Sequence, residues 1–74
     1  MSGTILKSDP HTGLQLYREM RTLSGRQFTH YKFRLVPAGA VPGHLIPGDI
    51  SSREENFVAF DRINQFLRDN PRGH

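Results

Sequence analysis

The chain contains no cysteine. It can therefore form neither a disulfide nor a thiolate metal site. Its four histidines stand at positions 11, 30, 44 and 74, and no two of them have the short spacing of a zinc-binding pair. We expect no bound metal and no other cofactor, and a fold that depends on side-chain packing alone.

Long hydrophobic runs are also missing. No apolar stretch approaches the roughly 18 residues that indicate a membrane-spanning helix. The opening residues, MSGTILKSDP, lack the apolar segment and small-residue cleavage site of a secretory signal. We expect a small soluble protein in the cytoplasm with no membrane association. Its 74 residues allow one domain, and a core of that size rarely contributes more than about 3–5 kcal/mol of net stability.

The sequence shows no sign of a catalytic apparatus. An enzyme needs polar groups that converge in a concave pocket, and a chain this short offers little concavity. The glycines between residues 39 and 48 are not followed by the Lys-Ser or Lys-Thr of a phosphate-binding loop. We therefore expect no catalytic residues and no enzymatic activity.

What the sequence does contain is a mirror-like stretch centred on Ser24-Gly25. Residues 28–36 alternate between apolar and polar side chains, as a strand does. Residues 14–23 supply a partner strand of matching parity across a two-residue turn. The predicted hairpin has one mostly apolar face and one basic, aromatic face. A helix over residues 14–23, with Gly25 as its C-terminal cap, is the alternative interpretation.

A C-terminal helix is predicted over residues 53–69. Ser52 followed by Glu55 forms a capping box, in which each residue satisfies a free amide at the helix start. Apolar residues then recur on one half of the helical wheel. Between hairpin and helix, two Pro-Gly pairs flank residues 44–46, which we expect to form a short third strand.

The predicted fold class is α+β: a small antiparallel sheet of two or three strands, made of a β-hairpin and a short third strand, packed against one C-terminal α-helix. Residues 1–12 are expected to be a flexible N-terminal tail, in which residues 4–6 could add a short edge strand before Asp9-Pro10 breaks the run. Residues 13–70 are expected to form a single domain, and residues 71–74 a frayed C-terminal tail. The expected core consists of Leu14, Leu16, Met20, Tyr31, Phe33, Leu35, Ile46, Phe57, Phe60, Ile63 and Leu67.

The basic, aromatic face of the hairpin is the predicted binding surface. Residues 14–36 carry five cationic side chains against one acidic one, although the net charge of the chain is only +3. We expect a non-enzymatic binding module in an interaction or regulatory role, whose partner is another protein or a second copy of the chain in a homodimer. Nucleic acid is the alternative, because single-strand binders combine stacking rings with cations that hold phosphates. The candidate residues are Tyr17, Arg21, Arg26, Phe28, Lys32 and Arg34.

Overall fold

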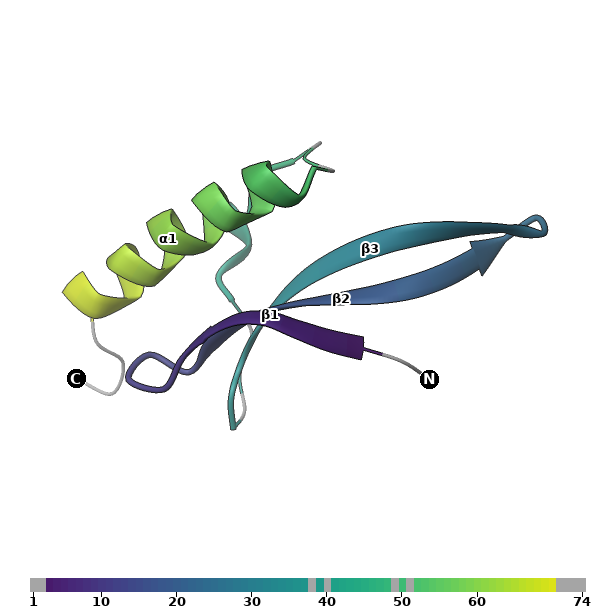
Figure 1. Cartoon of the computed structure of the whole chain (residues 1–74). Coiled ribbons are helices and arrows are strands. Elements are labelled where there is room, and N and C mark those ends of the chain that lie inside the picture. The colour runs from purple at the N-terminus through teal and green to yellow at the C-terminus, as the bar shows by residue number, and fades with distance from the viewer. Residues whose placement is uncertain (1–2, 38, 40, 49, 51, 71–74) are drawn as a thin grey trace.

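The computed structural model describes residues 3–37, 39, 41–48, 50 and 52–70. Three antiparallel strands form one sheet in the order β1-β2-β3, and one C-terminal helix packs against it (Figure 1). The predicted α+β class is confirmed. In the part of the chain that the structure describes, no helix is both long and apolar enough to cross a bilayer. The elements are β1 (Gly3–Asp9), β2 (Leu14–Leu23), β3 (Arg26–Leu35), the short 3-10 turn η1 (Gly43–Leu45) and α1 (Arg53–Asp69).

The β2–β3 hairpin turns at Ser24-Gly25, as predicted, and residues 14–23 are strand rather than helix. The pairing runs without a slip from Leu14 opposite Leu35 to Leu23 opposite Arg26. Ser24 and Gly25 have φ angles of 52° and 76°. Positive φ at both central residues is the signature of a type I′ turn, whose twist matches that of the strands it joins.

Serine is not the best residue for the first position of this turn, because a side chain other than that of Asn or Asp resists positive φ. Ser24→Asn is therefore expected to stabilise the protein by about 0.5 kcal/mol. Chemical denaturation of the two proteins measures the difference. A denaturation midpoint that stays the same or falls would contradict the expected gain.

The third strand of the sheet is β1, Gly3–Asp9, so the expectation of a flexible tail over residues 1–12 is wrong for residues 3–9. Strand β1 ends at Asp9, before Pro10, and the same two residues begin the turn into β2. The backbone N–H of Gly13 donates to the backbone oxygen of Asp9 at 2.8 Å. The N–H of His11 donates to the Asp9 side chain at 2.8 Å. The predicted tail at residues 71–74 lies outside the described residues.

Residues 44–46 do not form the predicted third strand. They overlap the 3-10 turn η1 instead, because the local backbone groups bond to one another. The N–H of Leu45 donates to the carbonyl of Pro42 at 3.0 Å, and that of Ile46 donates to the carbonyl of Gly43 at 3.2 Å. Donors used in this way are not available to a neighbouring strand.

Helix α1 begins and ends at the predicted residues. The N–H of Glu55 donates to the Ser52 hydroxyl at 3.1 Å, and the Ser52 N–H donates to the Glu55 side chain at 3.4 Å. This is the predicted capping box. Asn56 is also buried, and its side-chain amide donates to the carbonyl of Ser52 at 2.9 Å.

The core lies between α1 and the base of the hairpin. Met20 and Ile46 were expected in it but are 47% and 43% exposed. Met20 lies on the helix side of β2, yet the helix does not reach that far along the hairpin. Tyr31, Phe33 and Phe57 pack against the core while remaining partly accessible. The buried apolar residues are Leu14, Leu16, Leu35, Val41, Ala59, Phe60, Ile63 and Leu67.

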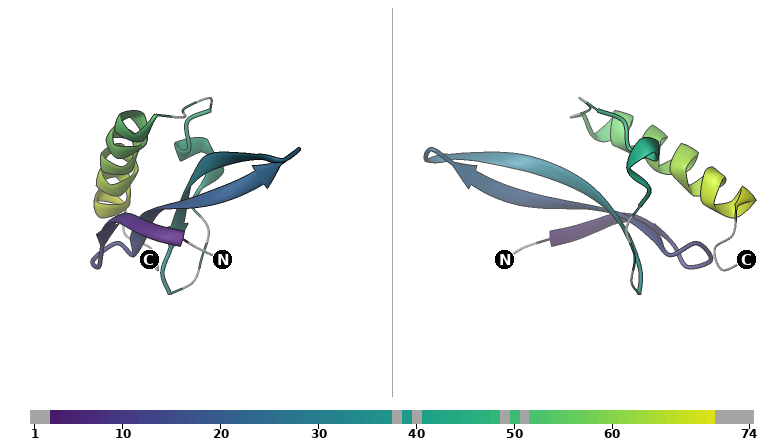
Figure 2. Two further views of the ribbon diagram at one scale, coloured as in Figure 1. Left: turned by 45° about the vertical axis from the view of Figure 1, so that its right-hand side comes forward. Right: turned by 180° about the vertical axis from the view of Figure 1, so that it is seen from behind.

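The distal half of the hairpin extends beyond the helix (Figures 1 and 2). Residues 20–29 are exposed throughout, on both faces of the two strands. The radius of gyration is 13.1 Å, compared with about 11 Å for a compact domain of this length. The sheet therefore presents a free two-stranded ribbon as well as an uncovered face.

Candidate functional site: a basic and aromatic sheet face

The strand register places all six predicted binding residues on one face of the sheet. Leu14 and Leu16 alternate with them along β2 and are buried in the core beneath α1, so this face points away from the helix. Tyr17 is opposite Lys32, and Arg21 is opposite Phe28. We name this surface the outer face; it consists of Gly3, Ile5, Ser8, Gln15, Tyr17, Glu19, Arg21, Leu23, Arg26, Phe28, His30, Lys32 and Arg34.

Arg34 is held in place by two neighbours on β2. Its Nε donates to the side-chain oxygen of Gln15 at 2.9 Å. Its guanidinium carbon lies 4.4 Å from the centre of the Tyr17 ring, which is within the range of a cation–π contact. Tyr17 therefore belongs to the outer face as predicted, but its ring is half-buried and supports an arginine. Its availability for stacking on a ligand is reduced accordingly.

Phe28 is the open aromatic side chain of the outer face. It is 47% exposed and lies beside Arg21 on the part of the hairpin that α1 does not cover. Arg26 lies at the hairpin end, opposite Leu23. These residues extend the basic and aromatic surface from the base of the sheet to the turn.

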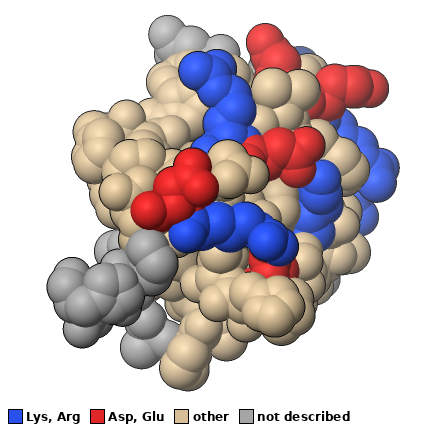
Figure 3. Space-filling model, turned by 90° about the vertical axis from the view of Figure 1, so that its left-hand side faces the viewer, with Lys and Arg blue, Asp and Glu red and all other residues tan. Residues whose placement is uncertain are grey.

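The charge on the outer face is not neutralised by nearby acids. It carries four cations, Arg21, Arg26, Lys32 and Arg34, against the single carboxylate of Glu19. Among the described residues the ion pairs are Lys7–Asp61 and Arg68–Asp9, and neither is on this face. At the opposite end of the molecule, by contrast, acidic and basic side chains are interleaved (Figure 3).

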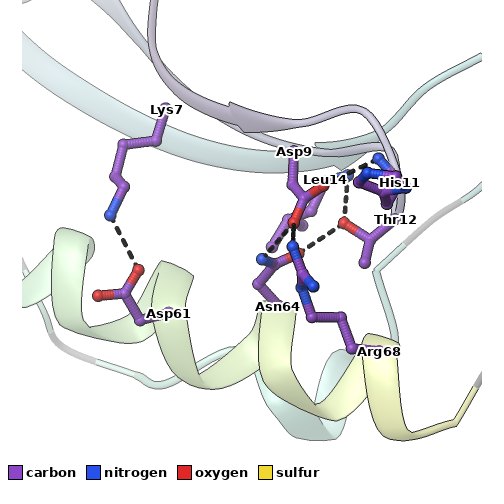
Figure 4. A network of polar contacts seen from close by, with 8 residues as sticks. All are labelled: Lys7, Asp9, His11, Thr12, Leu14, Asp61, Asn64 and Arg68. Atoms are coloured by element: carbon purple, nitrogen blue, oxygen red, sulfur yellow. Dashed lines mark hydrogen bonds and ion pairs between the residues drawn. The ribbon is translucent and has the colours of Figure 1, made fainter.

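A second polar cluster joins the β1–β2 turn to α1 (Figure 4). Asp9 accepts hydrogen bonds from Asn64 at 2.8 Å and from Arg68 at 2.6 Å. Thr12 donates to the Asn64 side-chain oxygen at 2.5 Å. The hydrogen bonds from Asn64, Arg68 and the His11 backbone, in that order of importance, hold the pKa of Asp9 well below its usual value. The hydrogen bonds of this cluster join the β1–β2 turn to α1, so its main role is to fasten two elements of the fold.

Sequence reasoning did not identify the members of the outer face that β1 supplies. Ile5 was missed because residues 1–12 were expected to be a tail; it is opposite Tyr17. Gln15 lies opposite Arg34 on this face as predicted, but its hydrogen bond with Arg34 depends on side-chain conformation, which the sequence does not reveal. Glu19 and His30 are cross-strand partners as expected, although no ion pair joins them.

The arrangement is suited to holding anions on an open sheet surface. Within the described ranges, no group of three His, Asp or Glu side chains could hold a metal ion. The outer face offers guanidinium and ammonium donors in a row, together with one exposed ring. Comparison of the chain with protein-family models, curated proteins and solved structures gave no match.

Proposed function

We propose that the chain is a nucleic-acid-binding module that holds a phosphate backbone against its outer face. The observation that carries the proposal is the row of four cations, Arg21, Arg26, Lys32 and Arg34, with no ion-pairing acid among the described residues. Arginine suits this role because its planar fork of donors matches the geometry of phosphate oxygens. Arg34 is already oriented by Gln15 and Tyr17, so less side-chain freedom is lost on binding.

The charge density favours nucleic acid over a protein partner at this face. Protein–protein interfaces are enriched in arginine and depleted of lysine and acids, but their centres hold few charged residues overall. Protein–DNA interfaces are more polar and much more positively charged. The outer face has cations along its whole length, from Arg34 at the base of β3 to Arg26 at the turn.

The shape of the hairpin favours a duplex over a single strand. A single-strand binder stacks successive bases on several rings, whereas the Tyr17 ring is occupied by Arg34 and leaves Phe28 as the open ring of this face. The major groove of DNA is about 12 Å wide and admits a two-stranded β-ribbon. The part of the hairpin that extends past α1 is such a ribbon (Figure 2).

A pair of double variants tests the proposal. Four phosphate contacts on duplex DNA predict a slope of about −3.6 for the logarithm of affinity against that of salt concentration. The double variant Lys32→Ala, Arg34→Ala removes two phosphate contacts, so the slope is expected to become shallower, at about −1.8. Arg53→Ala with Arg62→Ala removes the same charge from α1 and is expected to leave the slope unchanged. Fluorescence anisotropy with a labelled duplex at several salt concentrations measures all three.

Three results would count against the proposal. If duplex DNA does not bind even at low salt, the outer face is not a nucleic-acid surface. If the two double variants lower the slope equally, binding depends on net charge rather than on this face. Tighter binding of a single strand, together with sensitivity to Phe28→Ala, would contradict the preference for a duplex and indicate base stacking.

A further inference from the structure

The part of the hairpin that extends past α1 has different side chains on its two faces. Its cross-strand pairs are Met20–Thr29 and Thr22–Gln27 on the helix side, and Arg21–Phe28 and Leu23–Arg26 on the outer face. Leu23 is 68% exposed and Phe28 is 47% exposed. The outer face of this ribbon therefore holds two large apolar side chains in solvent, among the cations that we propose to bind phosphate.

The two apolar side chains are neighbours on the sheet. Leu23 is opposite Arg26, so Phe28, two residues further along β3, is the diagonal neighbour of Leu23 on the same face. A hollow of about 330 Å³, hereafter the hairpin hollow, is lined by Arg21, Thr22, Leu23, Phe28, Thr29 and His30. The large apolar groups of its lining are Leu23 and Phe28, so it is suited to receive a small apolar group.

Charge limits what can cover the hairpin hollow. Arg21 lines it, and Arg26 lies beside it, opposite Leu23. A second copy docked through the same face would bring these arginines against their own counterparts, which would repel one another. The hollow therefore fits an anionic partner that also presents an apolar group. Duplex DNA is such a partner, because phosphates border its major groove and thymine exposes a methyl group within it.

We propose that the hairpin hollow reads thymine in the major groove of duplex DNA, with Leu23 and Phe28 packed against thymine 5-methyl groups. This base preference rests on the proposed function and deepens it. Arg21 is on β2 and Arg26 on β3, so the two arginines are placed to contact phosphates on opposite sides of the groove. Phosphate contacts position a protein but carry no sequence information, so the preference comes from the apolar pair.

Thymine is the base that suits an apolar contact in this groove. Every base edge presents hydrogen-bond donors or acceptors there, and thymine adds a methyl group. Neither Leu23 nor Phe28 has a side-chain donor or acceptor for a base edge, but both can shield a methyl group from water. Burial of one methyl group corresponds to about a fourfold gain in affinity, and burial of two to about fifteenfold.

A duplex in which uracil replaces every thymine tests the proposal with the full chain. Uracil lacks the 5-methyl group, while the phosphates and the hydrogen-bonding groups of the duplex stay the same. In fluorescence anisotropy we expect the uracil duplex to bind about fifteenfold more weakly than the thymine duplex, with the same salt slope. Because 5-methylcytosine places a methyl group at the same position of a G·C pair, it should bind more tightly than cytosine.

Phe28→Ala and Met20→Ala are matched variants, because both side chains are 47% exposed and lie on opposite faces of the same ribbon. Phe28→Ala is expected to lower the preference for thymine over uracil to about fourfold, because one methyl group loses its contact. Adding Leu23→Ala should abolish the preference. Met20→Ala should leave it at about fifteenfold.

Equal binding of the thymine and uracil duplexes would overturn the base preference. If the salt slope is then still about −3.6, phosphate binding by the outer face stands without it. Equal loss of the preference in Phe28→Ala and Met20→Ala would also overturn the assignment to the hairpin hollow. If no duplex binds at low salt, the proposed function fails and the base preference fails with it.

Discussion

Gly13→Ala is expected to remove most of the stability of this protein. Gly13 has a φ of 81°, a conformation that costs an alanine about 1–2 kcal/mol. A Cβ at this position would also collide with the backbone carbonyl oxygen of Val36, which is not the end of a flexible side chain and cannot move aside easily. The combined loss should be on the order of 3 kcal/mol, against a total of about 3–5 kcal/mol for a core of this size.

The collision matters because Gly13 connects two parts of the fold. Its carbonyl accepts a hydrogen bond from the N–H of Val36 at 2.8 Å, which fastens the β1–β2 turn to the end of β3. Moving Val36 to make room for a methyl group would break this bond and disturb Leu35, a buried core residue. The damage is therefore expected to spread from the turn into the core.

Gly25→Ala is the matched control for this prediction. Gly25 has a similar φ of 76°, but no atom of its surroundings lies within 4 Å of a Cβ built there. Only the backbone cost remains, so a loss of about 1 kcal/mol is expected. Chemical denaturation measures both variants. Equal losses would show that the Val36 carbonyl moves away without cost and that the turn is not fastened as we describe.

The sequence was sufficient to predict the hairpin and the helix, because both are determined by local features. A period of two in residues 28–36 and a partner of the same parity define the register once the turn is located at Ser24-Gly25, because a slip of one residue would exchange the two faces. The capping box at Ser52 and Glu55 defines the start of α1 in the same local way. Both features lie within a few residues of what they determine.

The remaining elements depend on contacts between distant residues. β1 has little alternation of its own, and it becomes a strand because β2 offers it a free edge. Met20 has the parity of a core residue, but its burial depends on how far α1 reaches along the hairpin. The six candidate residues share a face through parity alone, whereas the support that Tyr17 gives Arg34 is a contact between side chains on different strands. A local sequence pattern does not reveal how far α1 extends along the hairpin, nor which side chains of neighbouring strands touch.

Asp9 provides the second large expected effect. Its side chain is only 9% exposed, and its Oδ2 accepts from both Asn64 and Arg68 while Oδ1 accepts from the His11 N–H. Asp9→Asn replaces one of these acceptors with an NH₂ group that must face donors, so buried polar groups lose their partners. We expect a fall in melting temperature several times larger than that caused by Asp61→Asn. Asp61 pairs with Lys7 at 2.8 Å but is 68% exposed, and pairs of that kind contribute little.

The pH dependence of the melting temperature shows whether Asp9→Asn destabilises the protein through loss of the carboxylate charge or through the altered hydrogen-bonding geometry of the side chain. The pKa of Asp9 is lower in the folded protein than in the unfolded chain, so the unfolded chain takes up the proton first as the pH falls. The stabilisation is then complete above about pH 5 and is lost progressively as acid is added. Asp9→Asn cannot titrate at this position, so the melting temperatures of the wild-type protein and the variant should converge as the pH is lowered from 7 towards about 2. Asp61→Asn should follow the wild-type curve closely. A difference between wild type and Asp9→Asn that stays constant over this range would mean that the Asp9 carboxylate charge does not hold the β1–β2 turn to α1.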